Sequence, residues 1–94
     1  MIKVKQAGKF TKLLDELYVE NPELEIEVSK RIRWFQDNPE DSRLDNHVLT
    51  KRMKSKWAFS ITDDIRIVYE WLGKTTVRLL AIGGHKKAYK RKFE

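Results

Sequence analysis

The spacing of apolar residues changes once along this chain, and that change is the strongest constraint on its fold. Between residues 10 and 35, apolar side chains recur every three or four positions, which lines one face of an α-helix. Between residues 57 and 82 they alternate or run continuously, as in β-strands. Helical segments that precede a run of strands predict an α+β fold, with the helices packed on one face of an antiparallel sheet.

Two helices are predicted in the first half of the chain. The apolar stripe of the first consists of Phe10, Leu13, Leu14, Leu17 and Tyr18. Asn21-Pro22 interrupts this pattern and can begin a second helix, with Asn21 as N-cap and Pro22 at the first helical position. The second stripe consists of Leu24, Val28, Ile32 and Phe35, before Asp37-Asn38-Pro39. The short turn between them predicts an antiparallel helical hairpin.

Strands are predicted on both sides of this hairpin. Ile2 and Val4 alternate with lysines and indicate a short N-terminal strand. After a polar loop over residues 38–46, three segments (57–62, 65–71 and 76–82) form an antiparallel meander, with the last segment central. Asp63-Asp64 marks a turn, and Gly83-Gly84 is expected to end the last strand. Residues 86–93 are expected to form a short, very basic helix or tail.

The positive charge of the chain lies in its second half. The whole sequence of 94 residues has a formal net charge of +6. Residues 1–47 carry eight Lys or Arg and ten Asp or Glu, whereas residues 48–94 carry twelve and four. This asymmetry predicts a polyanionic partner, and RNA or DNA comes first among cytoplasmic candidates; a lysine-rich surface that serves only solubility is the alternative.

The composition excludes several classes of protein. There is no cysteine, which excludes a disulfide framework, a thiol nucleophile and a Cys-ligated metal site. Two histidines without metal-binding spacing predict no metal and no other cofactor. The length and the 40% hydrophobic content indicate one folded domain over residues 1–94. Because no long apolar run is present, we expect no membrane span, no secretory signal and a cytoplasmic location.

The two histidines lie where sites are commonly built, although a histidine there is often only a surface residue. His47 opens the first β segment, and His85 follows Gly83-Gly84. Metal-free RNA cleavage needs a base for the 2′-hydroxyl, cations for the pentavalent phosphate and an acid for the leaving oxygen. The second half of the chain contains such groups: His47, Lys51, Arg52, Lys54, Lys56, Asp63, Asp64, Arg66, Arg78, His85 and Tyr89.

The aromatic residues divide into two sets. Core positions on strands are expected for Trp57, Phe59, Tyr69 and Trp71. Tyr89 instead lies in a basic segment, and the basic residues around it are Lys86, Lys87, Lys90 and Arg91. Its ring can stack on an unpaired base while these cations hold phosphates, or it can anchor the C-terminal turn on the sheet.

Two segments of the chain carry a recognisable pattern: residues 57–69 read WAFSITDDIRIVY, and residues 79–89 read LLAIGGHKKAY. They resemble the RelE/ParE toxin superfamily of bacterial toxin–antitoxin modules, nearest to its YafQ-like and RelE-like branch. The shared pattern is an aspartate, a few apolar residues, a tyrosine, a turn, an apolar strand, Gly-x-His and an aromatic residue. His47-Val48-Leu49 also matches a His-x-Leu that precedes the meander in YafQ-like toxins. The predicted order of elements matches the family over essentially the whole chain.

The resemblance implies a metal-independent endoribonuclease that cuts mRNA in the ribosomal A site, beside 16S rRNA, and that a cognate acidic antitoxin holds inactive. His85 would protonate the leaving 5′-oxygen, and His47 or Asp64 would take the 2′-hydroxyl proton. Arg66 and Lys51 would stabilise the pentavalent phosphate, and Tyr89 would orient the base or the phosphate. The implied RNA-binding residues are Lys51, Lys54, Lys56, Arg78, Lys86, Lys87, Lys90 and Arg91.

The chain departs from the YafQ-like pattern at Ser60, where those toxins carry a further histidine on the strand. The same fold also hosts ParE-like toxins, which poison DNA gyrase and perform no chemistry themselves, so the fold does not decide between the two activities. An RNA-binding domain without activity is a third alternative. The histidine pair and Asp64 favour the nuclease.

Overall fold

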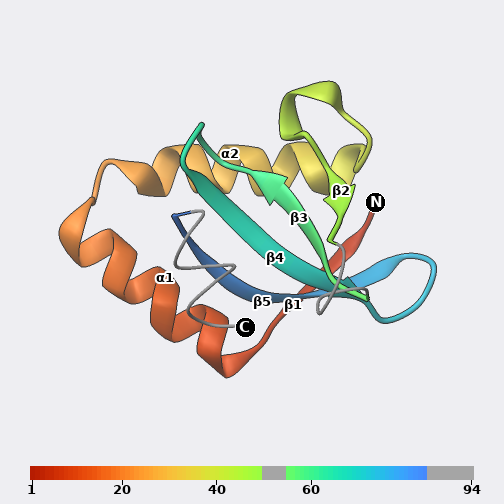
Figure 1. The fold of residues 1–94 in the computed structure, drawn as a ribbon, viewed down its shortest axis with the longest axis horizontal. Helices are drawn as coiled ribbons and strands as arrows, with labels where there is room; N and C mark the ends of the chain where they lie inside the picture. Colours follow the sequence, from red (N-terminus) through yellow and green to blue (C-terminus); the bar gives the residue numbers. More distant parts are fainter. Residues whose placement is uncertain (50–54, 85–94) are drawn as a thin grey trace.

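A computed structural model of the protein describes residues 1–49 and 55–84 (Figure 1). The elements are β1 (Lys3–Gln6), α1 (Gly8–Glu20), α2 (Leu24–Asp37), the 3-10 helix η1 (Ser42–Leu44), β2 (His47–Val48), β3 (Trp57–Ser60), β4 (Ile65–Trp71) and β5 (Thr76–Gly84). Within the described residues, five strands form one sheet in the order β1-β5-β4-β3-β2. β2 to β5 pair antiparallel, and β1 pairs parallel with β5. The α+β prediction is therefore confirmed.

Both helices bury their apolar stripes on the same face of the sheet. Phe10 of α1 and Phe35 of α2 are fully buried in one cluster with residues of β3, β4 and β5. The ring of Phe35 stacks on that of Phe59 with centroids 4.5 Å apart and meets the edge of Tyr69 at 4.9 Å. Trp57 joins this cluster as a partly buried residue. The prediction of a helical layer on one face is confirmed, as are the core positions of these aromatic residues.

The turn between the helices differs from the prediction. The Asn21 N–H donates to the Leu17 carbonyl at 2.7 Å, so Asn21 is the C-cap of α1 and not the N-cap of α2. The carbonyl of Asn21 then accepts the N–H of Leu24 at 3.0 Å, and α2 begins there after Glu23. The prediction was wrong because Asn-Pro is compatible with both a helix end and a helix start, and the hydrogen bond to α1 decides between them.

The polar loop predicted over residues 38–46 contains the short helix η1. The Asp41 side chain caps this helix by accepting the N–H of Arg43 at 3.0 Å. Leu44 at its end is fully buried in the cluster under the helices. The loop is thus tied to the core, and its next residues lead directly into β2. None of the helices in the described part of the chain is long and apolar enough to cross a membrane.

A β-bulge in β5 reverses the face of the sheet on which the later side chains of the strand lie. Val68 pairs with Ala81, whereas Tyr69 pairs with Leu79, so Leu80 is an extra residue in β5. Before the bulge, Leu79 packs under the helices; after it, Ala81 lies on the opposite face in a second cluster with Ala58 and Val68. The continuous apolar run of β5 therefore serves both faces.

β5 also extends further than predicted. Gly83 pairs with Arg66 and Gly84 pairs with Ile65, so the two glycines belong to the strand and do not end it. The reason is that β4 continues opposite them and pairs with their backbone groups, for which no side chain is needed. The basic helix or tail predicted over residues 86–93 lies outside the described residues.

Candidate nucleic-acid interface

The sheet face opposite the helices carries a concentration of cations. Directly paired residues of neighbouring strands share a face, and successive residues of a strand alternate between faces. His47 pairs with Ala58, and Ser60 pairs with Arg66, on the face away from Phe59. We call this side the cationic face; its charged and polar residues are Lys3, Lys5, His47, Lys56, Ser60, Arg66, Glu70 and Arg78.

Glu70 of β4 pairs with two of these cations. Its carboxylate accepts from Arg78 at 2.6 and 2.9 Å and from Lys56 Nζ at 3.4 Å. These bonds, above all those from Arg78, lower the pKa of Glu70 against the effect of partial burial. Lys56 and Arg78, both predicted to bind RNA, therefore lie together on one face and share a single carboxylate.

Among the described residues, Arg66 has fewer and longer hydrogen bonds than Arg78. Its side chain is 20% exposed, and Nη1 donates to Asp45 Oδ2 over 3.3 Å. Its Nε is buried and has no hydrogen-bond partner among the described residues. A buried donor without a partner is unfavourable. An anion at the exposed part of the guanidinium would form charge-assisted hydrogen bonds with it. The prediction that Arg66 holds a phosphate fits this environment.

His47 is fixed by its own loop. Its Nδ1 lies 2.8 Å from the carbonyl oxygen of Asp45. A carbonyl oxygen only accepts, so Nδ1 carries the proton of this bond and Nε2 of the neutral ring is left as the acceptor. His47 and Arg66, which were predicted separately, are thus brought together by one residue. Asp45 was not predicted, although Asp before Asn is a pair that tolerates left-handed backbone in tight turns.

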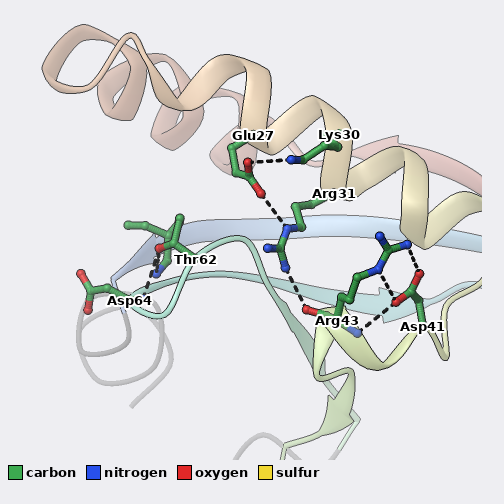
Figure 2. Close-up of polar contacts among 8 residues, drawn as sticks. Glu27, Lys30, Arg31, Asp41, Arg43, Thr62 and Asp64 are labelled. Carbon is green, nitrogen blue, oxygen red and sulfur yellow. Dashed lines mark hydrogen bonds and ion pairs between the residues drawn. The ribbon is translucent and has the colours of Figure 1, made fainter.

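Asp64 occupies a different place. It lies in the turn between β3 and β4, where Thr62 Oγ1 accepts the N–H groups of Asp64 at 3.2 Å and of Ile65 at 3.0 Å (Figure 2). It borders a cleft of about 550 Å³ beside α1, lined also by Glu16 and Glu20. Its carboxylate lies near Gly84, where a Cβ would approach Asp64 Oδ2 to 3.4 Å. Within the described residues, no hydrogen bond or ion pair joins Asp64 to His47 or Arg66.

The remaining predicted site residues lie outside the described part of the chain. They are the catalytic candidates His85 and Tyr89 and the RNA-binding candidates Lys51, Lys54, Lys86, Lys87, Lys90 and Arg91. Gly84, beside Asp64, directly precedes His85 in the sequence. Over residues 1–49 and 55–84, no group of three or more histidine and acidic side chains is placed to hold a metal ion.

Comparison with known proteins identifies the fold. No protein-family model matches the chain, and no curated protein matches it in sequence. A copper-bound mutant toxin from Helicobacter pylori superposes with a TM-score of 0.78 at 22% identity, covering 95% of this chain and 100% of that one. YafQ from E. coli gives 0.77 at 15% identity, covering 95% and 99%. A YoeB/ParE toxin from Agrobacterium tumefaciens gives 0.75 at 16% identity, covering 89% and 99%.

A further matching structure holds E. coli YafQ in a complex with DinJ, with a TM-score of 0.72 at 15% identity. At identities of this size, the property that the proteins share is the arrangement of helices and strands. The resemblance of residues 57–69 and 79–89 is therefore confirmed at the level of the fold. The chain has the fold of the RelE-like toxins.

Proposed function

We propose that this protein is the toxin of a bacterial type II toxin–antitoxin module and that it cleaves mRNA on the ribosome without a metal ion. The observation that carries the proposal is Arg66, a partly buried guanidinium whose Nε has no partner among residues 1–49 and 55–84, on a sheet face rich in cations. Such a group suits a phosphate whose negative charge increases during the reaction. The sequence resemblance to YafQ-like and RelE-like toxins implies RNA and the ribosome as targets, and the fold shared with YafQ and a YoeB/ParE toxin supports the choice of a toxin.

The proposed reaction is an attack of the 2′-oxygen on the neighbouring phosphorus. A base removes the 2′-hydroxyl proton, the new O–P bond forms and the bond from phosphorus to the 5′-oxygen breaks. His85 protonates that leaving oxygen, while Arg66 and Lys51 stabilise the pentavalent phosphate and Tyr89 orients the base or the scissile phosphate. The products are a 2′,3′-cyclic phosphate, or the 3′-phosphate formed when it opens, and a 5′-hydroxyl.

Of the two candidate bases, His47 is the better placed. Its Nδ1–H is engaged by the Asp45 carbonyl, so the lone pair of Nε2 is available to accept a proton. It is also linked to Arg66 through Asp45. Asp64 lies beside a cleft that carries further carboxylates, which repel a phosphate. We therefore assign the proton acceptor to His47.

The proposed partner is an acidic antitoxin that covers the cationic face with a helix or a strand. The complex of YafQ with DinJ supports a protein partner for this fold. An acidic segment would compete with RNA for the same cations, because both bring negative charge to Arg66 and its neighbours. Co-purification with the product of a neighbouring gene tests this partner directly.

The activity is tested with purified ribosomes programmed with a defined mRNA. We expect new cleavage products with the ends named above and a rate about 10²–10³-fold lower for Arg66→Ala, since a charge-stabilising donor is removed. Arg33→Ala is the matched control because Arg33 lies on α2, 67% exposed, and pairs only with Asp37 in the contacts described. It should cleave at the parental rate.

Two outcomes would contradict the nuclease. One is the absence of any new cleavage, and the other is an Arg66→Ala protein that cleaves as fast as its parent. A supercoiling assay with DNA gyrase separates the ParE-like alternative, since only that activity predicts inhibition. A protein that binds RNA with steep salt dependence and inhibits neither ribosome nor gyrase would be the inactive RNA-binding domain.

A further inference from the structure

Asp45 has an unusual backbone conformation. Its φ of 50° and ψ of 46° place it in the left-handed region, and it is the one residue other than glycine with positive φ in the described ranges. This conformation is uncommon for residues with a Cβ, and Asp and Asn adopt it more readily than the others. Asp45 ends η1 and lies two residues before His47, so its geometry determines how the chain enters β2.

The loop that contains Asp45 is anchored on its N-terminal side by α2. The guanidinium of Arg43 lies 3.5 Å from the centroid of the Trp34 ring. Arg31 Nη1 donates to the carbonyl of Arg43 at 2.8 Å, and Arg43 makes two side-chain bonds to Asp41 (Figure 2). These contacts hold η1 against the helix and leave Asp45 little freedom to change its backbone angles.

The sheet anchors the loop on its other side. The Tyr69 hydroxyl donates to Asn46 Oδ1 at 2.6 Å. Asn46 Oδ1 only accepts, so the hydroxyl is the donor of this bond, and burial raises the pKa of Tyr69 above its usual range. Asp45 is therefore fixed between α2 and β4, and two of its oxygens contact predicted catalytic groups: the carbonyl accepts from His47, and the carboxylate accepts from Arg66.

We propose that Asp45 is a positioning residue that sets the tautomer of His47 through its carbonyl and aims the guanidinium of Arg66 through its carboxylate. This inference rests on the proposed function, in which His47 and Arg66 act together on one phosphodiester. The Asp45–Arg66 pair is long, and the Asp45 side chain is 69% exposed, so a gain in stability is a poor explanation for it. Orientation of groups that act on a ligand explains both contacts.

The tautomer is measured without RNA, by long-range ¹⁵N–¹H correlation spectra of the histidine rings in the whole protein. We expect neutral His47 to carry its proton on Nδ1. Asp45→Gly keeps the left-handed backbone and its carbonyl, so the tautomer should be retained. Asp45→Val disfavours that backbone and should shift His47 toward the Nε2–H form. An Nε2–H ring in the parent, or the same tautomer in a folded Asp45→Val protein, would overturn the inference.

The carboxylate is tested by ribosomal cleavage kinetics. Asp45→Gly should lower kcat about tenfold with little change in KM, because Arg66 loses its orientation while the cationic face remains. Asp45→Asn tolerates the same backbone and keeps an oxygen for Arg66, so it should recover most of that rate. The control is Asp37→Asn on α2, 56% exposed, which should have no effect. Equal rates for Asp45→Gly and the parent would refute the role of the carboxylate.

The two measurements separate this inference from the function on which it rests. If the parent protein does not cleave mRNA while the tautomer responds as expected, the proposed function is overturned and the control of His47 by the Asp45 carbonyl stands. If the parent cleaves mRNA and neither readout responds to Asp45, the function stands and the positioning role is refuted.

Discussion

Arg66 and Glu70 lie on the same strand and the same face, and their surroundings divide the cations there into two groups. The carboxylate of Glu70 forms ion pairs with both Lys56 and Arg78. In the part of the chain that the structure describes, Arg66 has one long contact with an exposed carboxylate, and its Nε has no partner. An anionic ligand is therefore expected to engage Arg66 before it recruits the two cations held by Glu70.

Removing the Glu70 carboxylate should strengthen RNA binding. Glu70→Gln releases Lys56 and Arg78, and each additional phosphate contact steepens the slope of log affinity against log salt by about 0.7 for a single strand. Fluorescence anisotropy with a short single-stranded RNA over a range of salt concentrations measures this slope. Glu23→Gln, at the start of α2, makes the same change in net charge away from the cationic face. Identical slopes for both variants would argue against the cationic face as the RNA-binding surface.

The pair of Asp41 and Arg43 should make stability depend on pH in acid. Bonds from the Arg43 side chain and backbone lower the pKa of Asp41 from 3.8 to about 2. A carboxyl whose pKa is depressed by folding stabilises the protein above its unfolded pKa, and this contribution is lost as pH falls. The stability difference between the parent and Asp41→Asn should thus shrink between pH 3.8 and about 2. Guanidinium unfolding at several pH values checks this, with Asp15→Asn as the charge control.

At the scale of the elements, α2 has two roles. Its buried side, with Val28 and Phe35, packs on the sheet, whereas its more exposed side binds η1 through Arg31 and Trp34. The helix therefore supports the sheet from one side and also fixes the loop that leads to His47. Through that loop, a residue of α2 that contacts no ligand can affect the geometry of the cationic face.

Phe35→Ala should destabilise the protein strongly. The ring is fully buried and contacts Phe59, Tyr69 and Trp71, so its loss leaves a cavity and removes aromatic packing. We expect a loss of about 3–5 kcal/mol in the free energy of unfolding, measured with chemical denaturant. Ile26→Ala on the same helix removes a side chain that is 79% exposed and should change stability by no more than about 0.5 kcal/mol. Similar losses for both would contradict this packing.

For the whole molecule, the sheet separates two environments. One face is covered by helices and contains the large aromatic residues, and the other presents cations around a second apolar cluster of Leu49, Ala58, Val68 and Ala81. The cations of this face come from strands that are distant in the sequence, so their proximity depends on the complete sheet. The charge asymmetry between the two halves of the sequence understates the positive charge of this face, because Lys3 and Lys5 belong to the less basic half of the chain.

The effect of a charge reversal on RNA binding should therefore depend on the face that carries the residue and not on its position in the sequence. Lys5→Glu on β1 and Lys12→Glu on α1 change the net charge equally, but only Lys5 lies on the cationic face. We expect Lys5→Glu to weaken binding to single-stranded RNA and to lower the salt slope by about 0.7, with little effect of Lys12→Glu. The same anisotropy titration measures both. Equal weakening would indicate that net charge alone attracts RNA.

The features that follow from local periodicity could be predicted. The stripes ending at Tyr18 and Phe35 and the alternation around Phe59 identify helices and strands, because one buried face imposes the spacing. The bulge at Leu80 could not be predicted, since residues 79–82 are all apolar and one extra residue leaves no mark in such a run. Asp45 was missed because the Asp-Asn pair indicates only a turn, and its contact with Arg66 joins segments that are distant in the sequence.

The parallel pairing of β1 with β5 has a consequence for synthesis of the protein. Among the described strands, β1 pairs with β5 alone, and Lys3 pairs with Thr76, far along the chain. Contacts this distant form slowly, and none of these hydrogen bonds can exist before residues 76–84 have been translated. A translation product that stops earlier lacks the strand between β1 and β4 and cannot complete the sheet. Abortive products of synthesis would therefore lack the assembled cationic face, because β5 contributes Arg78 and joins β1 to β4.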